Sequence, residues 1–236
     1  MLDGEVVKKV DNFCYLGSTF SANSISPGED ISIRIGKATA VFGRLRKPLW
    51  QRDDISIATK MRVYRSAVLP TLLYSSETWR VLETDYRRLE VFQMNCLRQI
   101  IGVSKLQRVS NEEIRFTCLN QPTVTNLVKR NRLRWYGHVA RMEQSRIPFK
   151  CLNSQIPGNW AWWCPRAPKK LWKDLVKNDL EGTLKEAYGA GNWHDMWQQL
   201  TVELAKDRKQ WCTISDEVAW QGTAKANVDA KATKFK

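Results

Sequence analysis

The segment from Val124 to Met142, VTNLVKRNRLRWYGHVARM, carries the most regular pattern in the chain. At 100° per residue, one side of the resulting helix is apolar and consists of Val124, Val128, Trp135, Val139 and Met142. The opposite side carries Arg130, Arg134, Gly137 and Arg141, which we call the arginine row. A guanidinium grips phosphate with two hydrogen bonds, and a glycine leaves room for a close backbone. The pattern therefore predicts a helix that faces nucleic acid; an ordinary amphipathic helix is the alternative.

Most of the positive charge lies in two segments. The chain of 236 residues has a formal net charge of +14. Residues 34–65 contain nine basic and two acidic residues, and residues 124–150 contain seven basic residues and one acidic residue. Charge concentrated in this way indicates a polyanionic partner. Besides the arginine row, we expect four cations of the first segment to contact phosphates: Arg34, Lys37, Arg44 and Lys60.

Hydropathy and cysteine use narrow the class of protein. No apolar run reaches the roughly 18 residues that a membrane-spanning helix needs, so no membrane partner is expected. The N-terminus lacks a signal-peptide pattern, which favours an intracellular location in the nucleus or cytoplasm. Six cysteines are scattered without a C-x-x-C pair. Reduced cysteines, several of them in the core, are favoured over a disulfide framework.

The N-terminal residues predict a β-hairpin over Glu5–Phe20. An apolar first strand leads to a polar turn at Asp11-Asn12, and residues 13–20 are aromatic and β-branched, as is typical of a strand. Gly17 inside that second strand indicates a bulge or the close approach of another backbone.

Amphipathic helices follow the hairpin. Their starts are marked by capping residues ahead of apolar periodicity, namely Ser26, Asp54 or Ser56, Thr84, and Ser110. Pro70 is expected to kink or end the second of these helices, and Gly102 is expected to stop the third.

The sequence changes character after Lys150. Residues 156–165 are rich in Trp and Pro and predict an aromatic loop, after which a helix runs from Leu171 to about Leu180. A last amphipathic helix carries Trp193, Trp197, Leu200, Leu204 and Trp211. From Ser215 on, polar sequence without periodicity predicts a disordered tail. The fold class is thus mainly α, a helical bundle preceded by a short β-hairpin.

Few residue groups could carry catalysis. Asp53-Asp54 resembles a polymerase metal pair, but Gln51-Arg52 precede it in place of a hydrophobic strand, so helix capping is the favoured interpretation. His138 and His194 lie too far from the cysteines for a zinc module. No phosphate-cradling glycine loop and no Ser/His/Asp signature is present, so the chain by itself shows no active site.

Five segments together resemble the C-terminal part of reverse transcriptases of non-LTR (LINE-type) retrotransposons, most closely the RTE-like endonuclease–reverse transcriptases. They are FCYLGS at 13–18, LLYSSETW at 72–79, CLRQIIG at 96–102, RLRWYGHVARM at 132–142 and DRKQW at 207–211. Their order and spacing hold over residues 5–212. The family usually has Gly after Leu-Leu-Tyr, where this chain has Ser75.

The resemblance implies a division of the chain. Residues 1–22 would form a primer-grip hairpin, in which Phe13, Tyr15, Leu16 and Gly17 lie against the primer backbone. Residues 23–122 would form a thumb-like helical region, residues 123–214 the basic helix, aromatic loop and C-terminal helices, and residues 215–236 the disordered tail. Fingers and palm, with the aspartates that hold Mg²⁺, would lie N-terminal to Met1, so no catalytic residue, metal or cofactor is expected in this chain.

The sequence therefore predicts a nucleic-acid-binding C-terminal fragment of an RNA-directed DNA polymerase. It would clasp RNA or an RNA–DNA or DNA duplex through phosphates, dock on the palm and fingers, and not be an enzyme on its own. The alternative is a decayed helical protein that acts through protein contacts and has no nucleic-acid role. An exposed continuous apolar patch larger than a few hundred Å², together with an arginine row that is buried or ion-paired, would favour that alternative.

Overall fold

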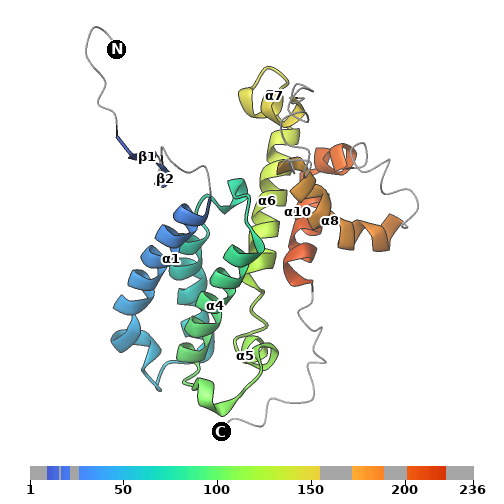
Figure 1. Cartoon of the computed structure of the whole chain (residues 1–236). Helices are drawn as coiled ribbons and strands as arrows, with labels where there is room; N and C mark the ends of the chain where they lie inside the picture. The colour runs from blue at the N-terminus through green and yellow to red at the C-terminus, as the bar shows by residue number, and fades with distance from the viewer. Residues whose placement is uncertain (1–9, 16, 22–26, 155–171, 189–200, 222–236) are drawn as a thin grey trace.

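The computed structural model of the chain describes residues 10–15, 17–21, 27–154, 172–188 and 201–221. Helices dominate these residues (Figure 1), with two short strands near the N-terminus. The predicted mainly α class is therefore confirmed. The predicted aromatic loop, Trp193, Trp197 and residues 222–236 of the predicted tail lie outside the described residues.

The N-terminal hairpin, predicted over Glu5–Phe20, is described from Asn12 to Ser21, and residues 5–9 lie outside the described residues. Strand β1, Asn12–Tyr15, pairs antiparallel with β2, Ser18–Ser21, and Tyr15 lies opposite Ser18. The predicted turn at Asp11-Asn12 is wrong, because the chain reverses between Tyr15 and Ser18 and the supposed second strand contains both strands. Gly17 has a φ of +83°, a left-handed conformation that glycine adopts without strain, so it serves the turn and not a bulge.

Nine helical elements follow between residues 27 and 117. They are α1 (Pro27–Arg44), η1 (Arg46–Trp50), α2 (Ile57–Val63), η2 (Tyr64–Val68), α3 (Leu69–Leu72), η3 (Ser76–Thr78), α4 (Glu83–Ile100), η4 (Lys105–Gln107) and α5 (Asn111–Thr117). Their buried side chains form a first hydrophobic core, which includes Ile31, Met61, Tyr64, Leu89 and Leu97.

Local capping explains several helix ends. The Ser56 hydroxyl accepts a hydrogen bond from the Thr59 amide, and Ser110 does the same for Glu113, as the sequence predicts. Gly102, with a φ of +72°, follows the end of α4. The predicted cap at Thr84 is wrong, because α4 begins at Glu83 and its N-cap position is Leu82, which makes no capping bond.

The second helix continues past Pro70 for two more residues. The π-helical turn η2 precedes it, so Pro70 enters α3 as one of that helix's first residues, and α3 ends at Leu72. Val68 and Leu69 are also helical, so Pro70, which has no backbone donor, lies inside one helical run from Ile57 to Leu72, just after its π-helical turn. Ser75 then takes a left-handed φ of 65°, at the position where the resembled family has Gly.

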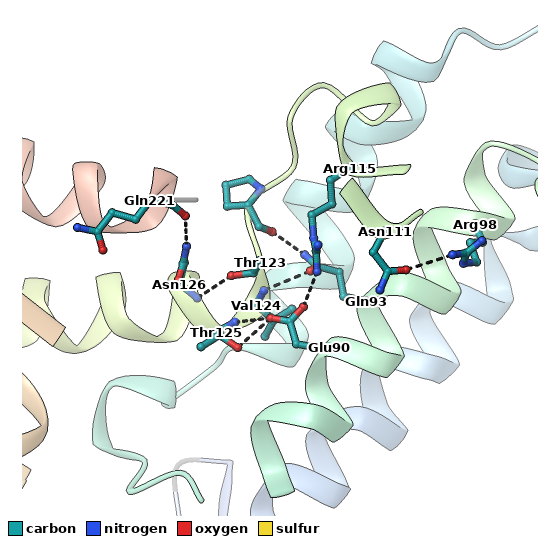
Figure 2. Close-up of polar contacts among 11 residues, drawn as sticks. Glu90, Gln93, Arg98, Asn111, Arg115, Thr123, Val124, Thr125, Asn126 and Gln221 are labelled. Atoms are coloured by element: carbon teal, nitrogen blue, oxygen red, sulfur yellow. Dashed lines mark hydrogen bonds and ion pairs between the residues drawn. The ribbon is translucent and has the colours of Figure 1, made fainter. Parts of the chain in front are cut away.

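Side chains from α4 fix the start of α6, Val124–Ala140. Glu90 accepts hydrogen bonds from the amide and the hydroxyl of Thr125 at 2.9 and 2.8 Å, and Gln93 accepts one from the Val124 amide at 3.2 Å. Thr123 caps Asn126, and Arg115 of α5 donates to the second Glu90 oxygen (Figure 2). The first amides of α6 are thus satisfied by the protein itself, which fixes the direction in which the helix leaves the first core.

A second hydrophobic core forms around the C-terminal half of α6. It is completed by α8 (Trp172–Tyr188), the helical residues 201–206 and α10 (Arg208–Trp220), and α7 (Ile147–Asn153) lies beside it. Its buried side chains include Leu133, Tyr136, Val176, Leu180 and Trp211. Since Val124, Leu127 and Val128 belong to the first core, α6 is shared by both cores.

Two C-terminal predictions need correction. The last amphipathic helix is broken at Asp207, whose carboxylate accepts hydrogen bonds from the amides of Lys209 and Gln210 and so starts a new helix, α10. The predicted start of a disordered tail at Ser215 is also wrong, because α10 continues to Trp220. Val218 and Ala219 there are fully buried, so the helix gains hydrophobic stabilisation over these residues.

Candidate nucleic-acid interface

The arginine row of α6 faces protein over much of its length. Arg134 forms an ion pair of 2.8 Å with Asp216 of α10, and Arg141 donates a 2.6 Å hydrogen bond to the carbonyl of Ala205. Arg130 is half-buried, and burial, together with the charge of Arg134, lowers its pKa. The row therefore lies along α10 and residues 201–206, and its two exposed arginines, Arg134 and Arg141, are bonded to these segments.

Within the arginine row, Gly137 lies directly against the side chain of Trp211. It is buried, and a Cβ placed on it would overlap the indole of Trp211. The Trp211 Nε1 donates a 2.7 Å hydrogen bond to the Leu133 carbonyl, so the ring is held across the helix at this point. The prediction that Gly137 leaves room for a polyanion backbone is corrected: the space in front of it holds an aromatic side chain.

Arg132, which the sequence analysis did not single out, joins the two cores. It is 1% exposed and pairs with Asp179 of α8, and it also donates to the Trp79 carbonyl and the Tyr86 hydroxyl. Burial disfavours charge on Arg132, but Asp179 and Tyr86 outweigh it and its pKa is raised. Burial also raises the pKa of Asp179, against the opposing charge of Arg132. No local pattern in the sequence points to this pair.

Arg34, predicted to contact phosphate, anchors the hairpin to α1. Its side chain is buried, and Nη2 donates a 2.6 Å hydrogen bond to the carbonyl of Gly17. Its guanidinium also lies 4.4 Å from the centre of the Tyr74 ring and 3.8 Å from a carboxylate oxygen of Asp30, which in turn accepts a hydrogen bond from Trp79. The prediction is corrected, because these protein contacts occupy the guanidinium.

Replacing Arg34 with Ala should free the hairpin. An isolated two-stranded hairpin is marginally stable, and a hydrogen bond from a charged group contributes about 1.5–3 kcal/mol. We expect amide hydrogen exchange of residues 12–21 to accelerate tenfold or more, as measured by mass spectrometry. Lys37→Ala, on the exposed side of the same helix, is the control and should leave this exchange unchanged. Equal exchange in Arg34→Ala would show that other contacts hold the hairpin.

The remaining cations of the first basic segment divide into buried and exposed groups. Lys60 is buried and donates to the Trp50 carbonyl at 3.1 Å, so its predicted contact with phosphate is also corrected. Lys37 and Arg44 are exposed on α1, seven residues apart and thus on the same side of the helix. Gly36 and Gly43 lie next to them, and a Cβ on either would meet nothing within 4 Å. The exposed side of α1 is therefore cationic and free of bulky side chains around its glycines.

The hairpin residues are only partly described. Phe13 is 55% exposed. The side chain of Tyr15 and all of Leu16 lie outside the described part. Gly17 is half-buried, and its carbonyl is used by Arg34.

The described residues include free thiols but no cluster of metal ligands. Within the described ranges, no group of three or more His, Cys, Asp or Glu side chains could hold a metal ion. Asp54 pairs with Arg52, and Ser56 caps α2, so the interpretation of Asp53-Asp54 as a helix cap is wrong. Cys96 and Cys118 are buried free thiols, as predicted for core cysteines, and burial raises the pKa of each to about 12.

Comparison with known proteins gives one relative. A protein of Caenorhabditis elegans, named as an uncharacterized transposon-derived protein, is 28% identical over 210 residues, which cover 87% of this chain and 70% of that protein. No protein-family model and no solved structure matches the chain. The similarity indicates a transposon-related origin. In the described part of the chain, no helix is both long and apolar enough to cross a membrane.

Proposed function

We propose that this chain is the primer-grip, thumb and following region of a non-LTR, RTE-like retrotransposon reverse transcriptase, and that it binds template–primer through phosphates. The resemblance of five ordered segments and the transposon-derived relative support this proposal. Catalysis, with its Mg²⁺, would reside in a palm and fingers that this chain contacts, so the chain would not be an enzyme on its own.

One structural observation carries the proposed nucleic-acid role, the exposed side of α1. Lys37 and Arg44 lie about 10 Å apart along the helix axis, since a helix rises about 1.5 Å per residue. Arg46 and Lys47 continue the exposed cationic surface into η1, and no acidic residue occurs between Ile31 and Arg52. Glycine inside an exposed helix costs about 1 kcal/mol relative to alanine, and no packing within the described chain explains Gly36 or Gly43. A nucleic-acid backbone that approaches α1 closely would contact the exposed cations and lie over the two glycines.

The proposed interface therefore consists of Lys37, Arg44, Arg46 and Lys47, not of the arginine row. Phosphate contacts from these residues carry no base information, so binding would not depend on sequence. The hairpin, held to α1 by Arg34, would present Phe13 to the primer end or to the palm.

A protein-contact role remains the second candidate function, because one observation favours it. Arg134 is paired with Asp216, Arg141 is bonded to the Ala205 carbonyl, and Trp211 packs on Gly137. These contacts are expected if the arginine row stabilises the fold and does not bind nucleic acid. In that case the chain would bind protein and show no specific salt-dependent affinity for nucleic acid.

Salt dependence separates the two functions. Each phosphate neutralised on a DNA duplex contributes about −0.9 to the slope of log K against log[salt], so Lys37→Ala with Arg44→Ala should flatten the slope by about 1.8 units. Binding to an RNA–DNA and a DNA duplex is measured by fluorescence anisotropy from 50 to about 200 mM KCl, where such contacts have their largest effect.

The control removes the same charge elsewhere. Arg146→Ala with Lys150→Ala, at exposed positions around α7, should leave the slope within about half a unit, since distant charges are screened beyond about 10 Å. Binding with an unchanged slope in the α1 double variant would refute α1 as the interface. Absence of duplex binding by the wild-type chain would refute the nucleic-acid role and favour protein contacts.

A further inference from the structure

A cleft of about 590 Å³ opens at the end of the first core that lies opposite the hairpin. It is lined by the segment that joins α1 to α2 and by the C-terminal end of α4 with the residues that follow it. Its volume lies within the range of roughly 300–1,000 Å³ that is usual for ligand sites. None of the proposed phosphate contacts except Arg46 lines it.

The cleft has an aliphatic wall. Ile55 and Ile57 line it from the side of α2, and Ile100, Ile101 and Val103 line it from the side of α4. Ile55, Ile57 and Ile101 are each only partly buried, so apolar surface remains accessible there. Burial of this apolar surface by a ligand would be favourable.

The polar lining is mainly cationic. Its charged residues are Arg46, Lys60, Arg98 and Asp53. Lys60 is occupied by its bond to Trp50, and Arg46 is exposed at the mouth. The lining thus favours an anionic ligand.

Arg98 is held in place with an unused donor. Its Nη2 donates to the Val109 carbonyl at 2.8 Å and to the Asn111 side chain at 3.1 Å, and Figure 2 shows the Asn111 contact. Its Nη1 is buried and has no hydrogen-bond partner within the described chain. A buried donor without an acceptor is unfavourable, and the guanidinium adds positive charge to the lining of the cleft.

The described lining of the cleft has no accessible aromatic ring on which a nucleobase could stack. Trp50, the aromatic residue of the lining, is 3% exposed and stacks on Phe42 with a centroid distance of 4.9 Å. Nucleobases in protein sites usually stack on an accessible aromatic ring or a guanidinium plane. The wall offers branched aliphatic side chains instead, which match the side chains of Leu, Ile or Val.

We propose that this cleft binds a short acidic peptide segment of a protein partner, in which an aliphatic side chain lies next to a carboxylate. The aliphatic side chain packs against Ile57 and Ile101, and the carboxylate meets Arg46 at the mouth and is attracted by the positive charge of Arg98. This role goes beyond nucleic-acid binding, because it places a protein partner on the side of the first core away from the hairpin.

The probe is a fluorescein-labelled hexapeptide, Gly-Glu-Leu-Leu-Glu-Gly, titrated with the full chain and followed by anisotropy. It should bind at least tenfold more tightly than Gly-Gln-Leu-Leu-Gln-Gly, which lacks the charge, and than Gly-Glu-Ser-Ser-Glu-Gly, which lacks the aliphatic side chains. Equal affinity for all three peptides would overturn the proposal.

Variants and spectra locate the site. Arg46→Glu should weaken binding of the acidic peptide tenfold or more, whereas Lys150→Glu, the same charge change on α7, should leave it within twofold. In ¹H–¹⁵N spectra of the wild-type chain, the amides of Gly102 and Ser104 should shift on peptide addition and those of residues 146–150 should not. Unmoved Gly102 and Ser104 amides, or displacement of the peptide by equimolar ATP, would overturn the proposal. Duplex binding by Lys37→Ala with Arg44→Ala is independent of this readout, so failure of either idea can be told from failure of the other.

Discussion

Asp179→Ala should lower the free energy of unfolding by about 3–5 kcal/mol, because it leaves the buried guanidinium of Arg132 without its counter-charge. The pair links α6 to α8, and the two side chains are 1% and 6% exposed. The hydrogen bonds of Arg132 to Trp79 and Tyr86 remain, but neither partner carries a negative charge. Urea unfolding followed by circular dichroism measures the loss.

Two further variants test the cause of this loss. Asp216→Ala breaks the half-exposed pair with Arg134 and should change stability by less than about 1 kcal/mol, the usual value for a surface ion pair. Arg132→Met combined with Asp179→Leu should recover most of the stability, since an apolar pair carries no desolvation penalty. A loss in Asp179→Ala as small as that in Asp216→Ala would show that Arg132 reaches solvent.

The same substitution, Gly to Ala, should have opposite effects on α6 and α1. Gly137→Ala should destabilise the chain by about 1–3 kcal/mol, because its Cβ overlaps the Trp211 ring and overpacking forces a shift of the core. That shift also endangers the hydrogen bond from Trp211 to Leu133. Gly43→Ala is the matched control and should stabilise the chain by up to about 1 kcal/mol, because the new methyl group meets nothing and alanine favours helix.

The thermal or urea unfolding midpoints of both variants report this difference directly. In a Trp211→Phe background the smaller ring should relieve the overlap, so the penalty of Gly137→Ala should shrink. A stabilising Gly137→Ala in the wild-type background would contradict the packing of α10 on α6 and would restore Gly137 as an open position.

Local sequence signals predicted where helices begin and end better than they predicted which segments pack against each other. Ser56, Ser110 and Gly102 act within a few residues of their own position, so capping rules identify them without knowledge of the fold. The span of α6 followed from its periodicity for the same reason. The hairpin turn was misplaced because alternation is the same on both strands, and only the left-handed φ of Gly17 decides where the chain reverses.

The candidate site depended on contacts that a single sequence does not reveal. Periodicity separated the apolar side of α6 from the arginine row, but it could not show that α10 packs on part of the second side as well, at Gly137. Arg34 was predicted to contact phosphate, yet its charge is balanced inside the fold by Asp30, and its Nη2 donates to the carbonyl of Gly17. Such pairings between distant segments decide whether a cation is internal or available. Of the predicted phosphate contacts, Lys37, Arg44, Arg134 and Arg141 are exposed, but Arg134 is paired with Asp216 and Arg141 is bonded to Ala205.

The position of α6 in both cores has a mechanical consequence. The helix has 17 residues and is about 25 Å long at 1.5 Å per residue. Its first turn is clamped by Glu90 and Gln93, and its one glycine is braced by Trp211, so it contains no free joint at which to bend. A helix held in this way behaves as a stiff rod. The position of α4 is therefore coupled to that of α10 through α6, because α4 holds the start of this helix and Trp211 of α10 is bonded to its C-terminal half.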